Sequence, residues 1–288
     1  MKQVLVNLQN NASSDQYLNE LRKLAVQNPI QDEYRSLAWK LLLRVKKIDV
    51  SRYITNIEKQ KSSRYEKIIK DTKRTLATDN FQRVVKEDQL IRVLNALQHD
   101  GIDYVQGINV LVAPLLYNMS EPEAFSSSLE LLKQTQTYYS PNLIGVHAAC
   151  ALVDKVLEKE DEQLRNYLQN KKITPLLIAF SRLMSFYASQ PPLEAVLRLW
   201  DFYMAAGFQM NVVTVVAELK INRDLILNSD SPTDVLQNMQ LSDVEILIQE
   251  SVRIYQGLDY KLKQLIGMHC FDFECCKKLV NKMFGGYL

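Results

Sequence analysis

Apolar residues recur at three- and four-residue intervals along this chain, and that spacing is the pattern of amphipathic α-helices. The clearest examples lie in the first fifty residues, at Tyr17, Leu21, Leu24 and Ala25, and then at Tyr34, Leu37, Ala38, Leu41, Leu42 and Val45. Thr174-Pro175 and Ser231-Pro232 place proline where the first turn of a helix accepts it. No run with strand periodicity competes, so the sequence predicts an all-α fold.

Length and composition place only broad limits on the number of domains and on the kind of partner. A chain of 288 residues that is 47% hydrophobic can bury a large core in one or two domains. With eight glycines and eight prolines there is no low-complexity linker, and no repeat of fixed period marks a solenoid. A net charge of +2 gives no reason to expect DNA, RNA or an anionic membrane as the main partner. We therefore expect one continuous helical body.

The four cysteines and the lack of a long apolar span indicate the compartment. Few cysteines are typical of reducing cytosol, and no stretch is long enough to predict a signal peptide or a transmembrane segment. His269-Cys270 and Cys275-Cys276 match no common zinc spacing and lie among apolar residues, so we interpret them as buried groups and expect no metal site. The sequence predicts a cytoplasmic protein.

Three short motifs occur in order along the first half. They are R-x-x-x-W from Arg35 to Trp39, I-x-x-D-x-x-R-T from Ile68 to Thr75, and Y-x-Q-G-x-N from Tyr104 to Asn109. Together they resemble the three motifs of the TBC family of Rab GTPase-activating proteins, and three motifs in register are far more specific than one. The chain itself lacks G-x-x-x-x-G-K-[ST], the phosphate-binding loop of a GTPase.

The two later motifs contain the residue types that GTP hydrolysis requires. A guanidinium stabilises the charge that shifts onto the phosphoryl oxygens, and a carboxamide orients the attacking water. The resemblance implies that Arg74 is an arginine finger given in trans, and that Gln106 is a glutamine finger replacing the GTPase's own glutamine. The GTPase would carry the magnesium and GTP, so the resemblance implies no cofactor in this chain.

Five further residues are expected to support these two, namely Asp71, Thr75, Tyr104, Gly107 and Asn109. Asp71 lies three residues before Arg74 on a predicted helix, a spacing that usually gives a surface ion pair. In the motif's context, Asp71 would instead hold the arginine ready for the GTPase.

The third motif is expected to be helical. One face would carry Tyr104 with Ile108, Leu111, Val112 and Leu115, and Gln106 would point away from it. Gly107 would then sit inside a helix, at a cost of about 1 kcal/mol relative to alanine. It would allow close approach either of a partner's backbone or of a neighbouring helix, and helix packing is the commoner reason for such a glycine.

The remaining motif residues are expected to be structural. We interpret Trp39 as a core residue and Arg35 as the partner of a buried carboxylate. Pro191 to Phe202, which contains Trp200 and Asp201, is similar to the C-terminal lobe of TBC domains, where a Leu-Trp-Asp turn is typical. Within the family, this part of the sequence looks like the mitotic-exit, or spindle-position, checkpoint GTPase-activating proteins of budding and fission yeasts.

The resemblance implies a two-lobed helical TBC domain with both fingers on the N-terminal lobe. It predicts an N-terminal helical extension over residues 1–28, the TBC domain over 29–234, and a C-terminal helical segment over 235–288 that packs on the domain. It further implies a small Ras- or Rab-like GTPase as partner, a scaffold subunit as a second partner, and a place at the spindle pole, centrosome or cytoskeleton within the cytoplasm.

Two alternatives stay open at this point. One is a non-catalytic scaffold of TBC shape that binds a GTPase or a regulator, and the other is a Rab GTPase-activating protein of general membrane traffic. The presence of both fingers favours catalysis; as an activator, such a protein supplies residues to another protein's reaction. A basic edge of Lys61, Arg64, Lys67, Lys70 and Lys73 precedes Arg74; it is more typical of a solvated face than of a surface that steers an acidic GTPase.

Overall fold

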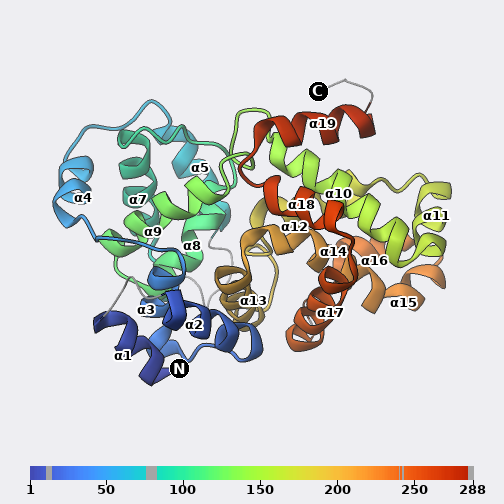
Figure 1. Ribbon diagram of the computed structural model, residues 1–288. Helices are drawn as coiled ribbons and strands as arrows, with labels where there is room; N and C mark the ends of the chain where they lie inside the picture. The colour runs from blue at the N-terminus through green and yellow to red at the C-terminus, as the bar shows by residue number, and fades with distance from the viewer. Residues whose placement is uncertain (11–14, 76–82, 240, 242, 285–288) are drawn as a thin grey trace. The chain divides into compact units, whose positions relative to one another are not determined.

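The computed structural model describes residues 1–10, 15–75, 83–239, 241 and 243–284, and all of its regular elements in these ranges are helices (Figure 1). The prediction of an all-α fold is confirmed. The chain forms two compact units rather than one continuous body. Unit 1 comprises Met1–Gln134 with Trp200–Ala206, and unit 2 comprises Thr135–Leu199 with Gly207–Leu288.

Unit 1 is built around two adjacent helices, α7 and α8. Its helices are α1 (Lys2–Asn10), α2 (Asp15–Gln27), α3 (Asp32–Leu42), α4 (Val50–Ile57), α5 (Tyr65–Thr75), α7 (Glu87–His99), α8 (Ile108–Asn118) and α9 (Glu121–Gln134). Helix α7 packs against α4, α5, α8 and α9, while α8 also packs against α3, α5 and α9. The near-continuous apolar sequence of α8 explains this central position, because a helix that is hydrophobic all round is stable only when buried.

Unit 2 is built around α10 and α14. Its helices are α10 (Ile144–Glu160), α11 (Glu162–Asn170), α12 (Pro175–Ser185), the first part of α13 (Leu193–Ala206), η1 (Phe208–Met210), α14 (Asn211–Ile221), α15 (Arg223–Leu227), α16 (Pro232–Asn238), α17 (Val244–Gly257), α18 (Tyr260–Met268) and α19 (Phe273–Phe284). Helix α14 is buried from Asn211 to Leu219. It packs against α10, α12 and α17.

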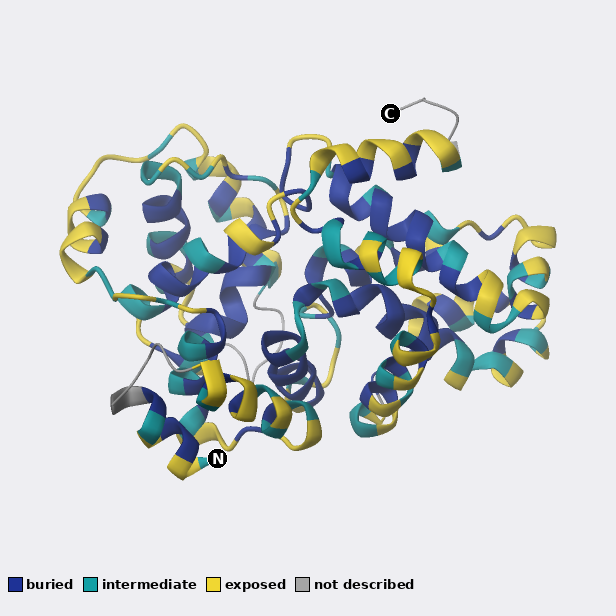
Figure 2. Ribbon diagram, viewed as in Figure 1, coloured by how far each residue is buried: buried dark blue, intermediate teal, exposed yellow. Residues whose placement is uncertain are grey.

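The C-terminal helices form a layer of unit 2. Helix α17 packs on α14, whereas α18 and α19 pack on α10. Helix α19 is buried where it contacts α10 and exposed on its other side (Figure 2). The contacts between Cα atoms therefore divide the chain into two units whose limits do not fall at residues 28 and 234. The division into segments 1–28, 29–234 and 235–288 stays a prediction.

Local signals set several helix ends as expected. The Thr174 hydroxyl accepts a hydrogen bond from the Leu177 amide at 3.4 Å, with proline in the first turn of α12. Pro232 likewise lies in the first turn of α16, although the Ser231 hydroxyl donates to the Asp234 carboxylate at 2.7 Å and does not cap the helix. The expected turn at Leu199-Trp200-Asp201 is wrong, because these residues lie inside α13.

No single described helix is long and apolar enough to cross a membrane. Leu193–Ala206 and Phe208–Ile221 reach that length and hydropathy only as a pair, and the pair is bent by 119°.

Candidate functional site

Helix α5 presents Arg74 on its exposed side. Its inner side, which packs toward α7 and α8, carries Ile68, Asp71 and Thr72, all buried. Arg74 lies in the last turn and is exposed, and its side chain has no hydrogen-bond or ion-pair partner among the described residues. An unpaired guanidinium at a helix end is available to a partner's anion.

Gln106 is held by a turn and not by a helix, which corrects the sequence interpretation. Helix α8 begins at Ile108, and Gln106 and Gly107 form a turn directly before it. Gly107 has φ of 108°, a conformation that side chains with a Cβ rarely adopt. The glycine is thus required by the backbone of this turn rather than tolerated inside a helix. Gln106 is exposed, as expected, and the predicted apolar face from Tyr104 to Leu115 is buried.

The five predicted supporting residues come together in one network, which we call the Asn109 network: Asp71, Thr75, Tyr104, Gly107 and Asn109. The Asn109 amide oxygen accepts from the Gly107 backbone N–H at 3.0 Å. The Asn109 amide nitrogen donates to the Thr75 hydroxyl and to the Asp71 carbonyl oxygen, the latter at 3.4 Å. One buried amide therefore joins the last turn of α5, which carries Arg74, to the turn that carries Gln106.

Tyr104 adds a second link between the same two segments. Its hydroxyl lies 3.1 Å from Asp71 Oδ2 and 3.2 Å from Asn109 Oδ1. A phenol has one proton, so it donates to one of these oxygens at a time. Burial, and then the neighbouring Asp71 carboxylate, raise the pKa of Tyr104 far above its usual range, so the hydroxyl stays a donor at physiological pH.

Asp71 forms no ion pair with Arg74, although both residues are described. The carboxylate is 8% exposed and is directed to Tyr104. The i,i+3 spacing suggested a surface pair, but Asp71 is buried whereas Arg74 is exposed. If Asp71 positions Arg74, it does so by fixing the helix end and not by touching the guanidinium.

Gln98 also holds this turn, and sequence reasoning missed it. Its side-chain oxygen accepts from the Tyr104 backbone N–H at 3.1 Å. No spacing signal could have revealed this bond, because its acceptor comes from the end of α7 and its donor is a backbone group. Lys67 lies 6.0 Å from the centroid of the Tyr104 ring, within the range of a cation–π contact.

The four predicted structural residues, Arg35, Trp39, Trp200 and Asp201, also come together, in what we call the Asp201 cluster. The Asp201 carboxylate is fully buried and accepts from Trp39 Nε1 at 2.7 Å and from Arg35 Nε at 3.2 Å. It also accepts from the Ile30 backbone N–H at 2.9 Å, a contact that the sequence did not indicate. The rings of Trp39 and Trp200 pack with centroids 5.8 Å apart.

The basic edge before Arg74 is exposed at all five positions, Lys61, Arg64, Lys67, Lys70 and Lys73. Arg64 pairs with Asp103 at 3.5 Å. Lys70 and Lys73 lie beside Arg74 on α5 and have no acidic partner among the described residues. The charge around Arg74 is therefore positive at close range.

The four cysteines are free thiols and all are buried, as expected. His269 is buried beside them; its Nδ1 lies 2.7 Å from the Ile266 carbonyl oxygen and must donate to it, so Nε2 accepts from the Tyr138 hydroxyl at 2.8 Å. Burial lowers the pKa of His269 to about 4. Within the described ranges, no three His, Cys, Asp or Glu side chains are grouped so that they could hold a metal ion.

Comparisons with known proteins identify the family of this chain. The family described as the Rab-GTPase-TBC domain matches residues 32–227. The chain therefore belongs to the Rab-GTPase-TBC domain family.

Two relatives illustrate the match. A Dictyostelium discoideum protein named after the mitotic check point protein BUB2 is 38% identical over 239 residues, 82% of this chain. The match spans 65% of that protein, less than two thirds of its length. Cell division control protein 16 of Schizosaccharomyces pombe is 32% identical over 244 residues, which cover 83% of this chain and 82% of that protein.

The fold has solved counterparts. The crystal structure of the Ypt/Rab-GAP domain of Gyp1p superposes with a TM-score of 0.68 at 18% identity, covering 87% of this chain and 97% of that one. At this identity the likeness concerns the fold alone. It agrees with the predicted class of a helical TBC domain.

Proposed function

We propose that this protein accelerates GTP hydrolysis by a small Ras- or Rab-like GTPase, with Arg74 and Gln106 acting in trans. The observation that carries the proposal is the Asn109 network, which ties the α5 end bearing Arg74 to the turn bearing Gln106. Both side chains are exposed. A cation and a carboxamide held on joined segments are the pair of groups that phosphoryl transfer to water requires.

Each group has a separate task in this proposal. The Arg74 guanidinium donates to the β–γ bridging oxygen and to a neighbouring γ-phosphate oxygen, where negative charge develops, and so stabilises the transition state more than the bound GTP. The Gln106 amide oxygen accepts a hydrogen bond from the attacking water and its amide N–H donates to a γ-phosphate oxygen, which holds the water in line. Magnesium and GTP enter with the GTPase, so this chain's own contribution is charge and geometry.

The relatives' names support a cell-cycle setting for this proposal. One relative is named after a mitotic check point protein and another is a cell division control protein. We propose a cell-cycle GTPase as the substrate, in the cytoplasm and at the spindle pole, with a scaffold subunit as a second partner. The family description itself names Rab GTPases, so Rab proteins belong in any test panel.

The test is a binding experiment on the full chain with purified GTPases of the Rab and mitotic-exit groups. Each GTPase is loaded with GDP, with a non-hydrolysable GTP analogue, or with GDP and aluminium fluoride, which mimics the planar phosphoryl group. An activator binds the mimic most tightly, because catalysis is differential binding to the transition state. Equal affinity for the analogue and the mimic across the panel, with and without a scaffold subunit, would identify a non-catalytic binding protein instead.

A second measurement tests the role of Gln106. Single-turnover hydrolysis is measured for the Gln106→Ala variant with the wild-type GTPase, and for the wild-type protein with a GTPase whose own water-positioning glutamine is replaced. We expect the first combination to lose most of the acceleration, by about 10²-fold or more, and the second to lose little. The reverse result would assign the water to the GTPase's glutamine.

A further inference from the structure

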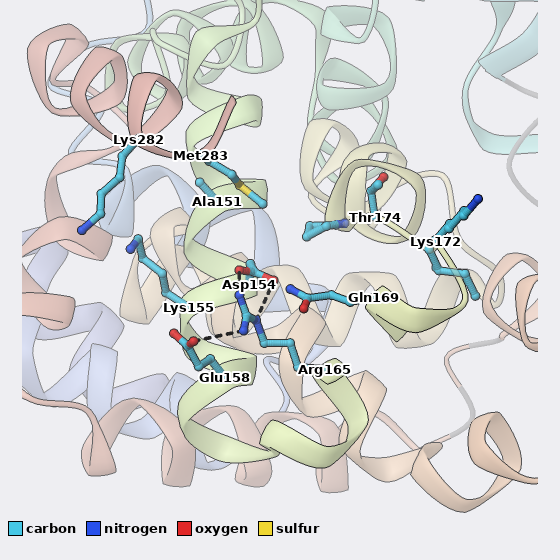
Figure 3. Close-up of a pocket in the computed structure, with 12 residues that line it drawn as sticks. Ala151, Asp154, Lys155, Glu158, Arg165, Gln169, Lys172, Thr174, Lys282 and Met283 are labelled. Atoms are coloured by element: carbon cyan, nitrogen blue, oxygen red, sulfur yellow. Dashed lines mark hydrogen bonds and ion pairs between the residues drawn. The ribbon is translucent and has the colours of Figure 1, made fainter. Parts of the chain in front are cut away.

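Unit 2 contains two adjoining hollows that the proposed GTPase reaction does not use. One has a volume of about 440 Å³ and the other about 470 Å³, and Lys155, Glu158 and Lys282 line both. We call them together the basic groove. In the first hollow, Lys155 and Lys282 extend into the same opening, beside the paired group of Asp154, Glu158 and Arg165 (Figure 3).

Lysines from three helices converge on this groove. Lys155 and Lys159 lie four residues apart on α10, and Lys278 and Lys282 lie four residues apart on α19, so each pair occupies one side of its helix. Lys261 comes from α18. Because α18 and α19 both pack on α10, the cations border one continuous depression.

The acidic side chains of the groove are already paired. Glu158 and Asp154 bind Arg165 at 3.0 and 2.7 Å, and Asp259 binds Lys159 at 3.3 Å. The lysines of the groove left without an acidic partner among the described residues are Lys155, Lys172, Lys261, Lys278 and Lys282. Four of these, all but Lys172, line the second hollow, where like charges repel one another and an anionic ligand would relieve that repulsion.

The second hollow is also lined by leucines. Leu262 and Leu265 lie on one side of α18 and are half-buried, and Leu279 on α19 is 4% exposed. Apolar surface within a depression that also carries charged side chains is the usual anatomy of a site for a peptide or protein segment. A free phosphate would use the lysines but leave these leucines without a role.

We propose that the basic groove binds an acidic segment of a partner protein, with Asp or Glu side chains on the lysines and apolar side chains on the leucines. A lipid surface fits less well, because the leucines line a hollow and none of them is fully exposed. Among the described residues that line the groove, Arg165 is the single arginine and is held by Asp154 and Glu158, so these residues offer no free guanidinium fork to a phosphate group. The proposal does not depend on Arg74 or on GTP hydrolysis.

The test begins with random peptides of about 16 residues displayed on phage and selected against the full chain at low salt. We expect the enriched sequences to combine Asp or Glu with Leu, Ile or Phe. The most enriched peptide is then synthesised with a fluorescent label, and its affinity is measured by anisotropy. Selected peptides without an excess of acidic residues would overturn the proposal.

Charge-reversal variants locate the site. We expect the double variant Lys155→Glu/Lys282→Glu to bind the labelled peptide about tenfold or more weakly, equivalent to about 1.4 kcal/mol or more. Lys277→Glu is the matched control, because Lys277 is exposed on the same helix, pairs with Glu274 and lines neither hollow. Its affinity, measured at about 0.15 M salt like that of the double variant, should stay within about twofold of the wild type, since Lys277 contacts neither hollow and exposed charges are screened at that salt.

Two further readouts decide the outcome. Thermal unfolding checks that the variants fold, and the neutral pair Lys155→Gln/Lys282→Gln replaces the reversed pair if that one is unstable. Vesicles of phosphatidylcholine with one-fifth phosphatidylserine test the lipid alternative. Unchanged peptide affinity in a folded double variant refutes the groove as the site, and vesicle binding that the same variant abolishes, without an effect on the peptide, assigns it to lipid.

Discussion

The polar motif residues of unit 1 form two clusters. One is buried throughout, and the other leads to exposed side chains. The Asp201 cluster is closed: its carboxylate is fully buried and accepts from Arg35, Trp39 and the Ile30 backbone. The Asn109 network is open: it is buried at Asn109 but leads directly to two exposed side chains, Arg74 and Gln106. Motifs of the same family thus specify one element that holds the fold together and another that positions groups for a partner.

This difference predicts two kinds of mutational effect. Loss of a group from the closed cluster should lower the free energy of unfolding, because it leaves a buried donor or charge without its partner. Loss of an exposed side chain at the end of the open network should leave that free energy nearly unchanged and remove activity. Substitution of a residue inside the open network should lower both the free energy of unfolding and the activity.

The largest expected effect is that of Arg74→Ala on GTP hydrolysis. An arginine finger in trans contributes about 10³- to 10⁵-fold in rate, equivalent to about 4 to 7 kcal/mol of barrier. Because Arg74 is exposed and has no described partner, its removal should change the free energy of unfolding by less than about 0.5 kcal/mol. Single-turnover hydrolysis and thermal unfolding, measured on the same preparation, check both parts.

Lys73→Ala is the matched control for Arg74. Lys73 is the preceding residue, is exposed and is also cationic. If charge near the site were sufficient, the two variants would lose similar activity. We expect Lys73→Ala to keep most of the acceleration, and a well-folded Arg74→Ala that retains more than about a tenth of wild-type kcat/KM would end the arginine-finger assignment.

Asp201→Ala should have the largest effect on stability. The substitution leaves Arg35 Nε, Trp39 Nε1 and the Ile30 backbone N–H buried without their shared acceptor and removes the fully buried partner of the Arg35 charge, which costs about 3 to 5 kcal/mol. Asp32 offers a close control, because it also bonds Arg35 but its side chain is 93% exposed. Asp32→Ala should cost less than about 1 kcal/mol.

Tryptophan fluorescence during urea unfolding can follow this comparison directly. The chain has two tryptophans, and both belong to the Asp201 cluster. Equal losses of unfolding free energy in Asp201→Ala and Asp32→Ala would show that burial does not set the strength of these bonds.

The sequence predicted residue identities better than it predicted contacts. Helix periodicity identified the buried face that continues from Tyr104 into α8. The order of the motifs predicted that Arg74, Gln106 and their five supporting residues form one site. It could not show that Asp201 bonds Arg35, because 166 residues separate them and no local pattern links the two. Tertiary partners also overrode local spacing at Asp71, which bonds Tyr104 instead of the nearby Arg74.

The turn at Gln106 shows a different limit. Tyr104 lies four residues before Ile108, so the apolar spacing of a helix continues unbroken through a segment that is not helical. Only Gly107 carried a contrary signal, and glycine in a sequence does not reveal the sign of φ. The same ambiguity affected Trp200 and Asp201, which lie in α13 although the family pattern suggested a turn.

Asn109→Ala should affect stability and activity together. The Gly107 N–H, the Thr75 hydroxyl and the Tyr104 hydroxyl each lose a partner, so we expect a loss of about 1 to 3 kcal/mol in unfolding free energy. Because the two finger-bearing segments are then joined less firmly, the acceleration of hydrolysis should fall by about 10-fold or more.

Asn95→Ala provides the control for a lost buried amide. Asn95 is 7% exposed and accepts from the Ser62 backbone N–H at 3.0 Å, before the start of α5 and not at its end. We expect a loss of stability in the same range with little loss of activity. Similar activity losses in both variants would mean that Asn109 acts through general stability and not through positioning.

The smallest expected effect is that of Gly107→Ala on the free energy of unfolding. The sign of this change shows whether Gly107 lies in a turn or in a helix. In a helix interior, Gly107→Ala would stabilise the protein by about 0.5 to 1 kcal/mol, because alanine loses less entropy on folding. With φ of 108°, alanine is instead strained, and we expect destabilisation by about 1 kcal/mol or more. Gly267 is the control, since it lies inside α18 and an added Cβ meets nothing within 4 Å. Gly267→Ala should therefore stabilise where Gly107→Ala destabilises, and stabilisation by both substitutions in urea unfolding would show that Gln106 stands on a helix after all.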